Sequence, residues 1–301
     1  MLNIGQHYAI KKPGDHMNDR YRIDEDCRLF RELRSLSQGE LAEMLGLGIM
    51  TVSRWESGQT EPSADNLEKF YSFIYRNGVR LNQIKEQFYR EELGKNEKLL
   101  FHGAKSLING EIRTDLSRKN NDFGQGFYMG ETFRQAGLFV SNIEKSCVYS
   151  IRFNDSGLEK AIYSVDTEWM LAVACYRGRL KGRVSEEKRM QICRKAEKAD
   201  YIIAPIADNR MYQIIDNFID GEITDEQCRH ALAATELGMQ YVLKTQKAAE
   251  HAEILERYYL CIPEKAHMVN ERSRDIKTAE DKVRAARIRY RGKGKYIDEL
   301  L

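Results

Sequence analysis

The sequence has no long hydrophobic run and no excess of charge of either sign. Its 301 residues carry a formal net charge of +2, with 42% hydrophobic and 31% charged residues. No stretch approaches the roughly 18 apolar residues of a membrane span, and residues 1–16 lack the apolar segment of a signal peptide. We therefore expect a cytoplasmic protein with no membrane partner, and the length predicts two domains or one large one.

Closely spaced cysteines are also missing. No Cys-x-x-Cys pair occurs, and the six cysteines are scattered over the chain: Cys27, Cys147, Cys175, Cys193, Cys228 and Cys261. This spacing fits neither a zinc site nor a disulfide framework. We expect reduced thiols in the core and no metal site. The chain also shows no repeats and no low-complexity tracts.

Residues 21–95 show the periodicity of five consecutive short helices. Ser37 and Glu40 have the spacing of a capping box, and Gly46 ends the helix that they open. Pro62 is predicted to start the fourth helix. Residues 1–20 are polar and irregular, and we predict a flexible arm there. The N-terminal region should therefore be an all-α domain.

The runs at residues 36–42 (LSQGELA) and 53–58 (SRWESG) resemble the signature of the lambda-repressor-like helix-turn-helix domain of the xenobiotic-response-element family. The resemblance implies DNA binding, with the second helix of the motif in the major groove. It implies that three residues face bases and two contact phosphates: Ile49, Met50 and Arg54 for bases, Gln38 and Thr51 for phosphates. Arg54 can pair with guanine O6 and N7.

The helix-turn-helix resemblance fails at three positions. Ile49 and Met50 stand where polar residues are usual, and Gly48 stands where a capping residue is usual. Two apolar side chains can contact thymine methyl groups. They can equally form a surface for a protein partner, so DNA binding and an interaction role both stay open.

The stretch FGQGFYMG at residues 123–130 predicts a tight loop that leads into a short strand, because glycine permits positive φ and close approach of another backbone. The simplest interpretation places Phe127 and Tyr128 in the core. The neighbouring motifs favour a ligand site instead. An apolar run ends at His102-Gly103, and a strand pattern begins near Gln240.

Strands and helices alternate irregularly over residues 96–263, which predicts an α+β fold with a split β-sheet. Strands are expected at 147–153, 201–207, 240–244 and 258–262, and helices at 131–142, 166–177, 209–218, 224–237 and 245–255. Residues 264–301 are predicted to form a C-terminal helix and tail. Residues 282–295 hold seven Lys and Arg residues and no acidic one. They form either a solvated helix or a phosphate-binding segment.

The order of these motifs over roughly residues 97–262 resembles the ADP-ribosyltransferase fold, in the branch shared by diphtheria toxin and the poly(ADP-ribose) polymerases. It is still more similar to bacterial domain-of-unknown-function family 3990. The resemblance is carried by four segments: His102-Gly103, residues 122–128, residues 205–210 and Gln240-Tyr241.

This resemblance implies NAD as the substrate. It implies a cofactor-binding set of His102 (adenosine ribose), Gly103 (nicotinamide amide), Gly126, Tyr128 (stacked on nicotinamide) and Phe139 (its other face), and a catalytic set of His102, Tyr128 and Gln240. Active members have glutamate where this chain has Gln240, and an amide carries no charge to stabilise the oxocarbenium-like transition state. Glu236 is a possible substitute. Asp208 and Arg210 either bind the pyrophosphate side or the target, or they form a helix cap and a surface ion pair.

The sequence thus predicts a DNA-binding domain fused to a mono-ADP-ribosyltransferase, as in a toxin or toxin–antitoxin component. The expected partners are DNA, NAD, an unknown protein or nucleic-acid acceptor, an antitoxin and a second copy of the chain. One alternative is a transcriptional regulator whose degenerate transferase domain only binds NAD or ADP-ribose. Another is an interaction protein in which neither domain keeps its ancestral ligand.

Overall fold

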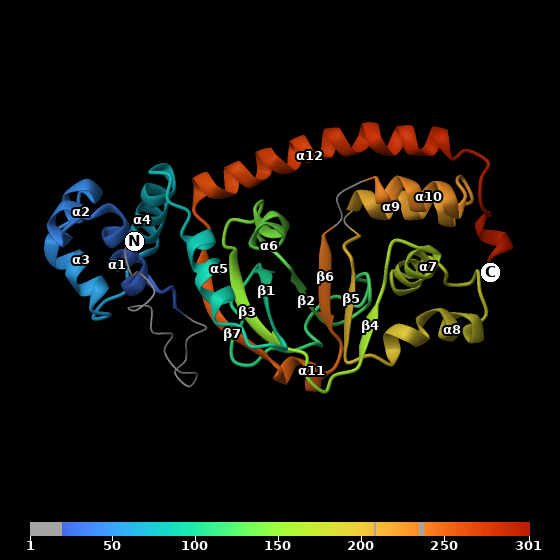
Figure 1. Ribbon diagram of the computed structural model, residues 1–301, viewed down its shortest axis with the longest axis horizontal. Coiled ribbons are helices and arrows are strands. Elements are labelled where there is room, and N and C mark those ends of the chain that lie inside the picture. The colour runs from blue at the N-terminus through green and yellow to red at the C-terminus, as the bar shows by residue number, and fades with distance from the viewer. Residues whose placement is uncertain (1–19, 208, 235–237) are drawn as a thin grey trace. The chain divides into compact units, whose positions relative to one another are not determined.

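The computed structural model describes residues 20–207, 209–234 and 238–301 (Figure 1). The predicted arm at residues 1–20 lies, except for Arg20, outside the described residues. The chain forms two compact units. The first comprises Met1–Glu111, Ala136–Phe153 and Glu253–Val269, and the second comprises Ile112–Gln135, Asn154–Ala252 and Asn270–Leu301.

The five predicted N-terminal helices are confirmed: α1 (Ile23–Arg34), α2 (Gln38–Leu45), α3 (Ile49–Glu56), α4 (Ala64–Arg76) and α5 (Leu81–Glu91). The capping box is present, because Ser37 Oγ accepts from Glu40 N at 3.2 Å and Glu40 Oε2 accepts from Ser37 N at 2.7 Å. Gly46 ends α2 in the left-handed conformation, at φ 59°. Helix α4 begins after Pro62 because Ser63 is its N-cap and accepts from Asn66 N.

The described residues contain seven strands: β1 (Glu97–Ala104), β2 (Phe127–Gly130), β3 (Cys147–Asn154), β4 (Lys160–Ile162), β5 (Tyr201–Pro205), β6 (Met239–Leu243) and β7 (Ala252–Tyr259). Their order in the sheet is β4-β5-β6-β2-β1-β3-β7. Strands β4 and β5 are parallel, whereas β6 pairs antiparallel with both β5 and β2. The mixed sheet with its helices confirms the α+β class.

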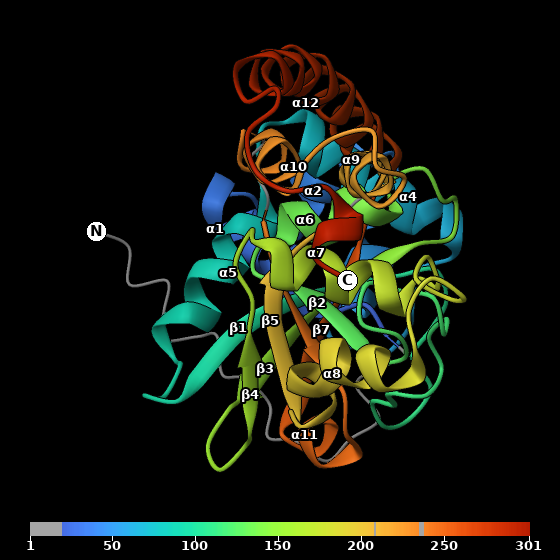
Figure 2. The ribbon, with the colours of Figure 1, turned by 90° about the vertical axis from the view of Figure 1, so that its right-hand side faces the viewer.

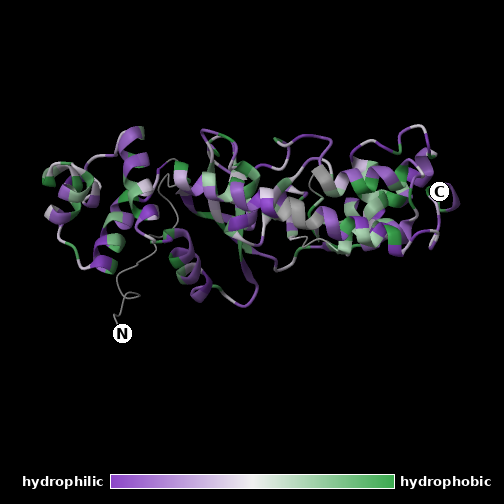
Figure 3. Ribbon diagram, turned by 90° about the horizontal axis from the view of Figure 1, so that it is seen from above, coloured by the Kyte–Doolittle hydropathy of each residue, from purple (hydrophilic) through white to green (hydrophobic). Residues whose placement is uncertain are grey.

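The remaining helices are α6 (Phe133–Val140), α7 (Thr167–Tyr176), α8 (Glu186–Glu197), α9 (Asn209–Ile219), α10 (Asp225–Ala233), α11 (Gln246–Glu250), α12 (Ile262–Arg289) and a 3-10 turn at Ile297–Glu299. In Figure 3 the ribbon carries both green and purple segments. Helix α8 and strand β4 were not predicted from the sequence. The signal for α8 was Ser185, whose Oγ accepts from Lys188 N and caps the helix.

The helix predicted over residues 245–255 is wrong beyond Glu250. Residues from Ala252 belong to β7, where Glu253 pairs with Arg152 of β3 at 2.9 Å. The predicted strand at 258–262 is likewise shifted, because β7 ends at Tyr259 and α12 begins at Ile262. Pairing within the sheet therefore overrides the helical pattern of this stretch.

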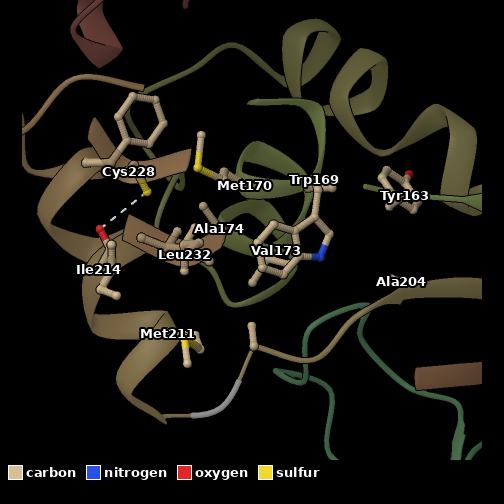
Figure 4. Close-up of a cluster of buried hydrophobic side chains, with 14 of the residues drawn as sticks. Tyr163, Trp169, Met170, Val173, Ala174, Ala204, Met211, Ile214, Cys228 and Leu232 are labelled. Carbon is tan, nitrogen blue, oxygen red and sulfur yellow. Dashed lines mark hydrogen bonds between the residues drawn. The ribbon is translucent and has the colours of Figure 1, made fainter. Parts of the chain in front are cut away.

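The core of the second unit is a cluster of buried side chains between helices and strands. Figures 1 and 2 show α7, α9 and α10 grouped beside β5. In Figure 4, Trp169, Met170 and Val173 of α7 face Ile214 of α9 and Leu232 of α10. Cross-strand pairing places Ile202, Val242 and Tyr128 opposite one another on the sheet. The helices therefore cover the face of the sheet that carries Tyr128, which packs against this cluster.

A buried ionic network joins the N-terminal helices to β7 within the first unit. Lys85 of α5 forms ion pairs with Asp26 of α1 and Glu256 of β7, and all three side chains are at most 2% exposed. Tyr71 donates to Asp26 Oδ2 at 2.6 Å, and Tyr89 donates to Glu256 Oε2 at 2.7 Å. Removing one member of such a network leaves an uncompensated buried charge, so each of the three side chains depends on the other two.

Glu264 in the first turn of α12 should make stability depend on pH. Its carboxyl accepts a hydrogen bond from Asn82 at 3.1 Å, and burial raises its pKa from 4.5 to about 8. The folded state therefore binds a proton that the unfolded state releases. Stability should fall as pH rises from about 4.5 to 8.

Replacing Glu264 with glutamine should remove this dependence and raise the melting temperature at pH 8. The amide keeps the size and the acceptor oxygen of the carboxyl group and has no proton to lose. Thermal unfolding at pH 5 and pH 8 measures the effect, with Glu250→Gln as the control because Glu250 is exposed. Equal shifts for both variants at pH 8 would contradict the prediction.

Candidate nucleic-acid and ligand sites

Helix α3 presents one face to solvent and buries the other. Ile49 is 54% exposed and Met50 is 61% exposed, and Arg54 lies one turn further along, also exposed. Val52 and Trp55 are buried. Gly48 precedes α3 and supplies no side-chain cap. The residues predicted to face bases therefore form one accessible stripe.

Glu56, at the end of α3, fixes this helix against α1 and α2. Its Oε2 accepts from Arg31 Nη2 at 2.8 Å and from Gln38 Nε2 at 2.7 Å. The pairing with Glu56 is the main reason why the pKa of Arg31 is raised. The Gln38 amide nitrogen thus serves the fold of the domain, and Thr51 is half-buried. The phosphate contacts assigned to Gln38 and Thr51 stay predictions.

His102 and Gly103 lie on β1, both half-buried. A Cβ atom at position 103 would come within 2.4 Å of the Ala136 carbonyl oxygen and 3.1 Å of Val140 Cγ1. Gly103 is therefore required for close packing of β1 on α6. Phe139, on α6, is 64% exposed, with Lys105 Nζ 5.6 Å from its ring centroid.

Gly124 and Gly126 determine the shape of the glycine-rich loop before β2. Gly124 has φ 72°, which favours glycine, and a Cβ at Gly126 would lie 2.7 Å from Val242 Cγ1. The Tyr128 hydroxyl donates to Gly124 O at 2.8 Å and accepts from Phe123 N at 3.1 Å. Burial raises the pKa of Tyr128. The phenol is therefore neutral, and its ring is fixed by the loop.

Gln240 is held in a buried polar cluster. It is 6% exposed, and its Nε2 donates to Asp122 Oδ2 at 2.9 Å and to the Pro205 carbonyl at 3.0 Å. Because Asp122 and the Pro205 carbonyl are both acceptors, the amide nitrogen of Gln240 must face them. Only Oε1 is then left to bind a ligand. Asp122 also accepts from Arg177 Nε at 2.9 Å and from Ala207 N at 3.2 Å. The Arg177 guanidinium lies 3.9 Å from the centroid of a further aromatic ring, that of Tyr212.

The structure brings Tyr128 and Gln240 onto one face of the sheet. Gln240 pairs with Gly130 and Val242 pairs with Tyr128, and residues two apart on a strand share a face. Gly126, Tyr128 and Gln240 belong to the second unit, whereas His102, Gly103 and Phe139 belong to the first.

No role was predicted from the sequence for Asp122 or Arg177. Asp122 immediately precedes the glycine-rich loop, and a carboxylate at that point was the available signal. Nothing marked Arg177. Asp208 and Glu236 lie outside the described residues, as does the side chain of Arg210.

The basic tail contacts α10 at both of its ends. The Tyr290 ring stacks on His230, in the last turn of α10, with centroids 3.5 Å apart, and the hydroxyl of Thr224, the N-cap residue, donates to the Lys293 carbonyl. Asp225 Oδ1 accepts from Lys295 N at 2.7 Å. Lys282, Arg284, Arg289, Arg291, Lys293 and Lys295 are exposed. The solvated and the phosphate-binding interpretations therefore both stay open.

These observations define a helix-turn-helix region joined to an α+β region. A helix-turn-helix profile matches residues 28–70, which indicates DNA binding or regulation. Residues 99–254, more than half of the chain, match the profile described as protein of unknown function DUF3990, and the chain belongs to this family.

Other comparisons are weaker. The chain is 29% identical over 113 residues to a UPF0758 protein of Staphylococcus aureus strain NCTC 8325, which covers 37% of this chain and 49% of that protein. A UPF0758 protein of strain Newman matches equally, over 46% of its length. The chain thus spans about half the length of these curated relatives. No solved structure matches.

Within the described residues, every helix is too short or too polar to span a membrane.

Proposed function

We propose that the protein binds specific DNA sequences through α3. The proposal is carried by the exposed stripe of Ile49, Met50 and Arg54 on a helix whose other face is buried. In this class of domain the second helix of the motif enters the major groove. There Arg54 can pair with a guanine, and the two apolar side chains can contact thymine methyl groups.

The rigidity of α3 supports this function. Glu56 connects α3 to Arg31 of α1 and Gln38 of α2, so the stripe is held in one orientation before DNA arrives. A preorganised reading helix does not have to be ordered on binding, so more of the contact energy appears as affinity.

Replacing Arg54 with alanine should weaken binding to the specific site by about 1–3 kcal/mol and leave non-specific binding nearly unchanged, because a base contact is lost. Selection of binding sites from random DNA would supply the operator, and anisotropy titration would supply both affinities. Arg76→Ala is the matched control, since Arg76 is an exposed arginine on α4. An equal loss at both kinds of site would make Arg54 a phosphate contact.

We propose as a second function that the DUF3990 region binds NAD and either transfers a single ADP-ribose to an acceptor or slowly hydrolyses NAD to ADP-ribose and nicotinamide. Its support is the fixed Tyr128 ring on the same sheet face as Gln240. A flat ring suits nicotinamide stacking, and Gln240 Oε1 can accept from a ribose hydroxyl. Without a carboxylate, a loss on the order of a hundred- to a thousandfold in rate is expected. The roles of His102, Gly103 and Phe139 stay predictions.

Two variants of Tyr128 separate stacking from loop anchoring. Tyr128→Phe keeps the ring and loses only the hydrogen bonds to Phe123 and Gly124. We expect it to retain NAD binding by calorimetry, whereas Tyr128→Ala abolishes it. Unchanged binding in the alanine variant would reject the site. If the wild type binds NAD but releases no nicotinamide, the region is a sensor and not a transferase.

A further inference from the structure

Two cysteines that are distant in the sequence meet between α7 and α8. Cys175 lies in the last turn of α7, Cys193 lies on α8, and their sulfur atoms are 3.0 Å apart. Both are free thiols. A disulfide has a sulfur–sulfur distance of about 2.05 Å, so closing the bond requires a movement of about 1 Å. The other cysteine of the second unit differs: Cys228 donates to the Ile214 carbonyl at 3.6 Å (Figure 4).

The two thiols have different environments. Cys193 donates its hydrogen to Cys175, and this bond, followed by the Arg189 guanidinium, lowers the pKa of the Cys175 thiol. The same bond and burial raise the pKa of Cys193. Cys175 is half-buried, whereas Cys193 is 2% exposed. A partly exposed thiol of lowered pKa beside a second thiol is the arrangement of an attacking and a resolving cysteine.

We propose that Cys175 and Cys193 are a redox-active pair that closes to a reversible disulfide in the presence of a peroxide. The Cys175 thiolate attacks one peroxide oxygen, the O–O bond breaks, and hydroxide leaves when the oxidant is hydrogen peroxide. The Cys193 sulfur then attacks the sulfenic sulfur of Cys175, the S–O bond breaks, and water leaves. Two thiols thus lose two electrons to one peroxide.

The disulfide would act beside the candidate ligand site. Cys175 is followed by Tyr176, which bonds to Glu197 of α8, and then by Arg177, the partner of Asp122. Oxidation would join the end of α7, which carries this arginine neighbour, covalently to α8. Asp122 connects this point to the candidate site, because it is also the hydrogen-bond partner of Gln240. Formation of the bond requires neither DNA nor NAD, so it can be tested independently of both.

In the experiment, the reduced 301-residue protein is treated with one equivalent of hydrogen peroxide. Free thiols are then alkylated, and the peptides are mapped by mass spectrometry. We expect one intramolecular disulfide between Cys175 and Cys193, the loss of two alkylatable thiols, and recovery of both with dithiothreitol. Mapping of the wild type requires no variant to fold.

Variants test the order of attack. Cys193→Ser should leave Cys175 as a sulfenic acid that dimedone traps, Cys175→Ser should give no such adduct, and the control Cys228→Ser should still form the disulfide. The absence of a 175–193 linkage in the wild type would overturn the proposal. A linkage to another cysteine, or equal dimedone labelling of Cys175→Ser and Cys193→Ser, would also overturn it.

Discussion

Replacing Lys85 with methionine should destabilise the protein by about 3–5 kcal/mol, because it leaves two buried carboxylates without their shared cation. Lys85 is the ion-pair partner of both Asp26 and Glu256, and these side chains are at most 2% exposed. Methionine fills a similar volume, so the loss reports the charge and not a cavity. Urea unfolding of the wild type and the variant measures it.

Three further measurements test this explanation. Lys195→Met removes an exposed pair with Glu168 and should cost at most about 1 kcal/mol. Adding Asp26→Asn and Glu256→Gln to Lys85→Met should recover much of the loss, because neither of the two carboxylates then remains as an unpaired buried charge. The deficit should also shrink on acidification. Burial already raises the pKa of Asp26 to about 6 in the wild type, and without Lys85 the carboxyl would hold its proton more tightly still.

A fragment that contains only the DNA-binding region would lack part of this network. Glu256 lies on β7, far along the chain from the five helices whose Lys85 and Tyr89 it binds. A fragment that ends after α5 would leave Lys85 with Asp26 as its acidic partner and would expose apolar surface. If such a fragment failed to bind DNA, the cause could be that it does not fold. The full chain should therefore be used to test DNA recognition.

Replacing Gln240 with glutamate should destabilise the protein by about 3 kcal/mol at pH 7.5. Glutamate is the residue of active transferases in the resemblance described above. Here, however, it would lose the hydrogen bonds to Asp122 and Pro205 and would place a second carboxylate about 3 Å from Asp122. In a buried site, two carboxyl groups at such a short distance cannot both ionise, so one of them must keep its proton.

The loss should depend on pH in a defined direction. The folded state of the variant would hold a proton that the unfolded state releases, so the loss should be larger at pH 7.5 than at pH 5. Gln246→Glu is the matched control, because the exposed Gln246 also donates to a carbonyl, that of Ile112 at 3.2 Å. A Gln240→Glu variant with wild-type stability and faster nicotinamide release would contradict the prediction, because it would show that the hydrogen bonds from position 240 to Asp122 and Pro205 do not contribute to stability.

Local signals in the sequence were enough for the N-terminal helices. The capping box of Ser37 and Glu40, the left-handed Gly46 and the apolar periodicity each act over three or four residues, so they can be read without knowing the rest of the fold. The strand after the glycine-rich loop was predictable for the same reason, since Gly124 requires a positive φ. The motifs that define the family could likewise be recognised in the sequence.

Only the tertiary structure decided which residues that are distant in the sequence contact one another. Gln240 bonds to Asp122 across 118 positions, Glu256 bonds to Lys85 across 171, and the sulfur of Cys193 meets that of Cys175 across 18. Sheet register and helix packing set such contacts, and residue patterns do not encode them locally. For the same reason Gly103 was predicted as part of a ligand motif, although close packing against Ala136 also requires a glycine there. The first residues of β7 were predicted as the end of a helix, because only their pairing in the sheet identifies them as a strand.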